Sequence, residues 1–205
     1  MDPQTYSKWY KNYKKCAHMD PKPETTPTRT QLSVLQAILA SGSCYVDMGR
    51  WGNFQGHAAR AMKCEGQVPG PNGTTVRADF KGPPDFTAWQ ICFMVYMVAM
   101  VMLEQVLPPW LVAYIDIISE YNSLYGHRIW AFLYQTDVRF RSEHMGVMAM
   151  RESERLDGAI LRGCTTDYDP AKPWDCLWRM AVDINDSQES RWWYRNFERR
   201  IPMFL

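Results

Sequence analysis

The sequence predicts a mainly α-helical bundle with a small β-hairpin and an extended N-terminal arm. Three observations lead to this class: long segments with apolar residues at helical spacing, a Pro71-Asn72-Gly73 turn signal between two short extended runs, and a polar, Pro-rich N-terminal segment. Of the 205 residues, 46% are hydrophobic and 22% are charged, which is ordinary for a globular domain. The net charge of +1 means that nucleic-acid binding would need a local cationic patch.

Residues 1–29 are predicted to form this arm and its linker, because the segment DPKPETTPTRT resists packing. Basic residues outnumber acidic ones here by six to three, so the arm is the best candidate for a cationic patch. A frayed terminal helix with solvated lysines is the alternative, and it stays open. The candidate nucleic-acid-binding residues are Lys8, Lys11, Lys14 and Lys15, and the candidate self-association residues are Trp9 and Tyr10.

Residues 30–165 are predicted to form the helical core. Leu32, Leu35, Ile38 and Leu39 give a short helix after Thr30 an apolar face. Further elements are expected as a helix near 54–63, the hairpin near 66–80, and helices near 85–106, 108–123 and 127–158. Residues 166–205 are expected to add a C-terminal helix pair, near 172–184 and 187–200, packed on or adjoining the core.

The uncharged run from Phe86 to Leu103 is predicted to lie at the centre of the bundle. A membrane span needs about 20 predominantly apolar residues, but Glu104 ends this run and Pro108 then breaks the helix. Asp85, after two prolines, has the character of an N-cap. These residues therefore favour a core helix over a membrane role, and a membrane-associated subunit that uses residues 86–118 is kept as an alternative.

Polar residues interrupt the apolar face of the helix expected near 127–158. Asp137 and His144 share that face, and Arg141 lies four residues beyond Asp137, a spacing suited to an ion pair. Asp137 and His144 are two helical turns apart, roughly 10 Å, which is too far for one metal ion or one hydrogen bond. We therefore predict that Asp137, Arg141 and His144 form a structural polar network.

The sequence contains no constellation typical of an enzyme, a metal site or a cofactor site. Six cysteines lack Cys-x-x-Cys spacing, and no signal peptide precedes them, which favours reduced thiols in the cytoplasm or nucleus. Asp47 lies in a Tyr-Val-Asp-Met segment without the second carboxylate that two-metal chemistry requires. We expect no enzymatic activity, no metal, no cofactor and no small-molecule substrate.

The C-terminal segment SRWWYRNFERR interleaves aromatic and basic side chains. Such a mixture can stack on bases and contact phosphates, or it can anchor a last helix through its aromatic rings. Both interpretations stay open. The candidate nucleic-acid-binding residues are Arg191, Arg195, Arg199 and Arg200, and the candidate self-association residues are Trp192, Trp193 and Phe197.

Several segments follow one another along the chain in a distinctive order: CYVDMGRWGNF, ARAM, the PNGT turn, GPPDFTAWQICFMVYMVAMVML, LVAYIDIISEYNSLYGHRIWAFLYQTDVRFRSEHM and DPAKPWDCLWRMAVD. Together these segments resemble a family of Gag-like, capsid-type proteins of dinoflagellate retroelements. The resemblance covers roughly residues 32–205 and is most specific over 108–147. It implies a retrotransposon structural protein that forms homo-oligomers and helps package or organise RNA. A domesticated module that binds nucleic acid or protein is the alternative.

Overall fold

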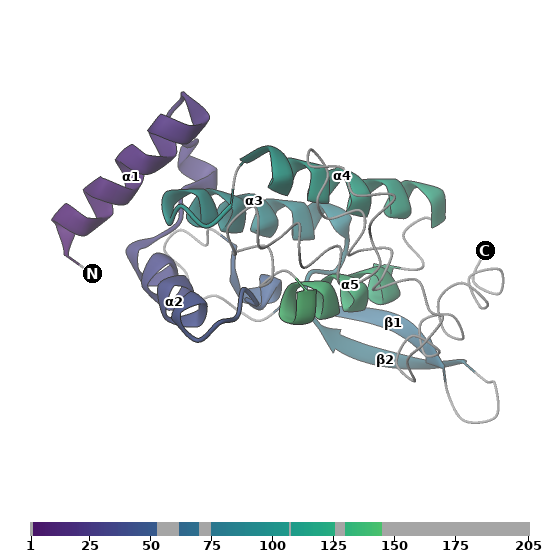
Figure 1. The fold of residues 1–205 in the computed structure, drawn as a ribbon. Coiled ribbons are helices and arrows are strands. Elements are labelled where there is room, and N and C mark those ends of the chain that lie inside the picture. Colours follow the sequence, from purple (N-terminus) through teal and green to yellow (C-terminus); the bar gives the residue numbers. More distant parts are fainter. Residues whose placement is uncertain (1, 53–61, 70–74, 107, 126–129, 145–205) are drawn as a thin grey trace, which may run out of the picture.

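The computed structural model describes residues 2–52, 62–69, 75–106, 108–125 and 130–144 (Figure 1). In this part of the chain the fold is mainly α-helical, which confirms the helical part of the predicted class. The helices are α1 (Pro3–Ala17), α2 (Arg29–Ala40), α3 (Phe86–Met102), α4 (Pro108–Tyr125) and α5 (Trp130–Arg139). Short 3-10 turns η1 (Pro23–Thr25) and η2 (Met48–Arg50), a π-helical turn η5 (Phe140–His144), and strands β1 (Lys63–Pro69) and β2 (Thr75–Lys81) complete it.

Helix α1 replaces the extended arm that the sequence predicted. Asp2 caps its N-terminus by accepting from the backbone N–H groups of Gln4 and Thr5, at 3.2 and 3.0 Å. His18 ends the helix in the left-handed conformation, with φ of 56°. The prediction of an extended arm was wrong because these caps and an aromatic stripe on one side of the segment favour a helix.

The aromatic side of α1 packs on the core. Tyr13 is buried, and Tyr6, Trp9 and Tyr10 are partly buried against the same hydrophobic cluster. Asn12 Nδ2 donates to the backbone carbonyl of Met102, at the end of α3, over 3.4 Å. The core therefore begins before residue 30, and α1 lies across one end of the bundle (Figure 1).

Helix α3 runs through the middle of the bundle beside α4 (Figure 1). Asp85 caps it as predicted, accepting from Ala88 N at 2.8 Å. Eleven of its 17 residues are buried, including Trp89, Phe93 and Tyr96. The prediction that this helix forms the core is confirmed, and no helix within the described ranges has the length and apolar character needed to cross a membrane.

Helices α4 and α5 follow α3 in the chain. Helix α4 packs on α3, and α5 packs on α4. Pro108 opens α4, where its fixed φ and missing N–H suit a first turn. The third long helix differs from the prediction, because α5 ends at Arg139 and the backbone continues as the π-helical turn η5 to His144. The remainder of that predicted helix and the C-terminal pair lie outside the described residues, as does most of the helix expected near 54–63.

The strands β1 and β2 pair in antiparallel fashion next to α5 (Figure 1). Cys64 lies opposite Phe80 in the register, and Gly66 lies opposite Ala78. The expected turn residues, 70–74, lie outside the described part of the chain. At the base of the pair, Gly82 N donates to the Met62 carbonyl over 2.8 Å, which ties the end of β2 to the start of β1 just before α3 begins.

Candidate functional site

The lysines of α1 lie on the face that turns away from the core. Lys8, Lys11 and Lys15 follow one another at steps of three and four residues, so they share one side of the helix, and all three are exposed. Lys14 is also exposed and pairs with Asp20 at 3.2 Å. The aromatic stripe on the opposite side fixes the helix, so the free lysines form a row held in place on the surface. We call Lys8, Lys11 and Lys15 the lysine row.

Because α1 packs on the core, its aromatic residues have less exposed surface for contact with a partner. Trp9 and Tyr10, the candidate self-association residues, are half-buried against the chain's own core. Tyr6 is held by the Arg29 guanidinium over its ring, at 5.5 Å from the centroid. Less aromatic surface is therefore available at this end of the molecule than the sequence suggested. The candidates in the last segment, from Arg191 to Arg200, lie outside the described residues.

A buried ion pair occupies the centre of the bundle. Arg141 Nη2 contacts Asp137 Oδ2 at 2.7 Å, and both side chains are completely buried. The structure thus brings together two of the three predicted network residues, at the predicted four-residue spacing. His144 ends η5, and its side chain lies outside what the structure describes.

Two aromatic donors complete the coordination of the Asp137 carboxylate. Trp89 Nε1 donates to Oδ2 over 3.0 Å, and the Tyr114 hydroxyl donates to Oδ1 over 2.9 Å. Burial and the adjacent Asp137 raise the pKa of Tyr114 well above its ordinary value, so this phenol stays a donor. Sequence reasoning missed both partners, although a Trp and a Tyr buried in a helical core each need an acceptor.

Arg141 is satisfied on its other side as well. Its Nη1 donates to the Val46 carbonyl over 2.6 Å, and its guanidinium lies over the Tyr45 ring, at 5.2 Å from the centroid. Burial alone would lower the pKa of Arg141, but the Asp137 carboxylate outweighs that effect and raises it. The network therefore joins α3, α4, α5, η5 and the segment after α2.

This arrangement is suited to structure rather than to catalysis. A general acid or base must reach its substrate, whereas Asp137 and Arg141 have no exposed surface. Within the described ranges, no three His, Cys, Asp or Glu side chains converge as metal ligands. On the surface that the structure describes, the lysine row is a feature with a clear preference for anions.

Buried thiols give the fold a sensitivity to alkaline pH. Burial raises the pKa of Cys44 and of Cys92 from 9.0 to about 11. Between pH 9 and 11 an unfolded chain loses thiol protons that the folded chain keeps. The contribution of each thiol to the free energy of unfolding is therefore fully present below pH 9 and is lost as the pH rises through 11. Because one pKa unit corresponds to about 1.4 kcal/mol, each thiol should account for about 2–3 kcal/mol.

Urea unfolding at pH values from 8 to 11, followed by circular dichroism, measures this decline. Cys92→Ala is expected to make the dependence on pH shallower between pH 9 and 11. Cys16→Ala is the matched control, because Cys16 is exposed and its removal should leave the slope unchanged. Equal slopes for Cys92→Ala and the unmodified chain would contradict the assignment.

Comparisons with protein-family models, with curated proteins and with solved structures give no match for this chain.

Proposed function

We propose that this chain is a Gag-like structural protein of a retroelement, which binds RNA through the lysine row and self-associates to package or organise that RNA. The observation that carries the proposal is the two-sided character of α1. Its aromatic side is docked on the core, and its lysines are exposed on the other side. Lys8 and Lys15 are two helical turns apart, roughly 10 Å along the axis. Cations in such a row suit successive phosphates of a flexible strand.

The resemblance of segments in 32–205 to Gag-like proteins supports a structural role. The ionised groups at the centre of the bundle stabilise the fold, since Asp137 and Arg141 form a buried ion pair. Function is then left to the surface. In this proposal α1 supplies RNA contacts, and association between copies uses other surfaces of the chain.

Reversing the charge of the lysine row should weaken RNA binding. We expect Lys8→Glu, Lys11→Glu and Lys15→Glu together to reduce affinity for a labelled single-stranded RNA roughly tenfold or more, because three phosphate contacts are lost. The slope of log K against log salt concentration should become shallower by about 2, since each contact to a single strand contributes about 0.7. Fluorescence anisotropy at several salt concentrations measures both quantities.

The hairpin supplies a matched control with the same change in charge. Lys63, Arg77 and Lys81 are exposed on β1 and β2, and their replacement by Glu alters net charge equally. That variant should keep most of the affinity and most of the salt slope. If the two triple variants lose affinity to the same extent, net charge explains the binding, and α1 is not the interface.

Self-association separates the proposed packaging role from a domesticated RNA-binding module. Sedimentation velocity over a range of protein concentrations, with and without RNA, should show concentration-dependent growth beyond the monomer. A monomer throughout, with salt-dependent RNA binding, would instead support the module. A monomer that binds no RNA would contradict both.

A further inference from the structure

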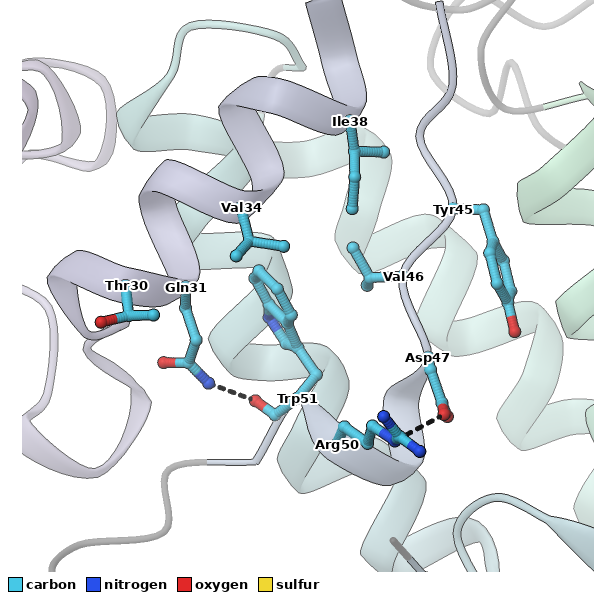
Figure 2. A pocket seen from close by; sticks show the side chains of 9 residues that line it. All are labelled: Thr30, Gln31, Val34, Ile38, Tyr45, Val46, Asp47, Arg50 and Trp51. Atoms are coloured by element: carbon cyan, nitrogen blue, oxygen red, sulfur yellow. Dashed lines mark hydrogen bonds and ion pairs between the residues drawn. The ribbon is translucent and has the colours of Figure 1, made fainter. Parts of the chain in front are cut away.

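A pocket of about 430 Å³ lies between α2 and the segment from Tyr45 to Trp51 (Figure 2). Its walls are largely apolar, with Val34 and Ile38 on α2 facing Val46 and the Trp51 indole. This volume is within the range of about 300–1,000 Å³ that small-ligand sites occupy. Val34 lines the pocket and is 46% exposed, so an apolar molecule can reach this wall without unfolding the helix.

One end of the pocket carries a cation with unused hydrogen-bond donors. Arg50 Nε lies 3.5 Å from Asp47 Oδ2, and the Arg50 side chain is 64% exposed. Asp47 also accepts from Gly49 N over 2.9 Å, so its carboxylate is compensated twice. The terminal nitrogens of Arg50 have no acceptor among the described residues. A guanidinium in this state is suited to binding a carboxylate or another small oxyanion.

The wall of the pocket also contains an uncompensated polar group. Trp51 is 5% exposed, and its Nε1 has no hydrogen-bond acceptor within the part of the chain that the structure describes. Its neighbour Gln31 does not serve, because the Gln31 Oε1 already accepts two hydrogen bonds, from Thr28 N at 2.8 Å and from Thr28 Oγ1 at 3.0 Å, and its Nε2 is itself a donor. An unsatisfied buried donor is unfavourable, so this side of the pocket gains if a ligand brings an acceptor and the ring adjusts to meet it.

We propose that this pocket binds a small amphipathic organic anion, with an apolar body and one carboxylate or similar acidic group. The apolar body lies against Trp51 between Val34 and Val46, and the acidic group lies at Arg50. Charge complementarity with Arg50 selects an anion over a neutral molecule of the same shape. The proposal does not depend on RNA binding, because none of the lysines of α1 lines the pocket.

Octanoate is the probe, with octanol as its neutral match, and the full chain is titrated with each. Binding is followed through the indole N–H signal of Trp51 in heteronuclear NMR spectra, assigned with Trp51→Phe. Octanoate is expected to shift this signal saturably and to bind at least about tenfold more tightly than octanol, a difference that one well-placed charge-assisted contact can supply. Arg50→Gln should remove the preference while leaving octanol binding unchanged.

A pair of variants on α2 tests the location. Val34→Glu places a negative charge in the wall and should weaken octanoate roughly tenfold or more. Gln36→Glu adds the same charge at an exposed position that does not line the pocket, and it should bind as the unmodified chain does. Equal affinity of these two variants, or equal affinity for octanoate and octanol, overturns the proposal. Displacement of the signal by an acidic peptide, with no effect of octanoate, also overturns it and assigns the pocket to a peptide.

Discussion

Asp137→Asn is expected to lower the free energy of unfolding by about 3–5 kcal/mol, the usual result of removing one partner from a buried ion pair. Asparagine keeps the shape of the side chain, but it leaves the Arg141 guanidinium buried without a counter-ion. One carboxylate oxygen also becomes an NH2 group, so only one of the two donors, Trp89 Nε1 or the Tyr114 hydroxyl, keeps its acceptor. Because ordinary domains are stable by about 5–15 kcal/mol, much of the total would be lost.

Urea unfolding followed by circular dichroism measures the effect. Asp116→Asn is the matched control, because Asp116 is exposed on α4 and the same change should cost little there. The double variant Asp137→Leu with Arg141→Met removes both charges and should recover part of the loss. If Asp137→Asn unfolds at the same urea concentration as Asp116→Asn, the charge on Asp137 does not support the fold.

Features of the fold that depend on residues close together in the sequence could be predicted from it. The apolar run after Asp85 predicted the buried helix α3, and the aspartate itself predicted the cap. Pro108 marked the first turn of α4. In each case the determinant is local, since caps and periodic faces act over one or two turns. The same locality explains the Asp137–Arg141 pair, which is set by a spacing of four residues.

Helix α1 shows how composition can mislead. The Pro/Thr-rich linker and the lysines favoured an arm, but Tyr6, Trp9, Tyr10 and Tyr13 recur at helical spacing. Because that period places four aromatic rings on one side, their burial outweighs the solvation of the lysines on the other. The signal was present in the sequence, and weighing period above composition would have found it.

Other parts of the candidate site have no local signal. Val46 lies 95 residues from Arg141, and Trp89 lies 48 residues from Asp137, yet both are direct partners in the network. The pocket likewise arises where α2 meets the segment around Trp51. Tertiary packing creates these contacts, and no local pattern in a single sequence predicts them.

Gly82→Ala is expected to destabilise the chain through two separate effects. The φ of Gly82 is +153°, which side-chain-bearing residues rarely adopt, and such strain costs about 1–3 kcal/mol. A Cβ at this position would also lie 2.6 Å from Cζ and 2.8 Å from Cδ1 of Tyr134. That ring cannot move away freely, because it is 2% exposed and stacks on Trp130 with centroids 6.1 Å apart. Overpacking of this kind adds about 1–3 kcal/mol.

Gly42→Ala separates the two effects when both variants are unfolded in urea. Gly42 also has a positive φ, +81°, but a Cβ there meets nothing within 4 Å, so its replacement should cost the backbone strain alone. Gly82→Ala combined with Tyr134→Leu should recover part of the larger loss by making room for the methyl group. Equal costs at the two glycines would contradict the close approach of Tyr134. A larger cost at Gly82 means that the first residue after β2 is a glycine because Tyr134 of α5 packs directly against it.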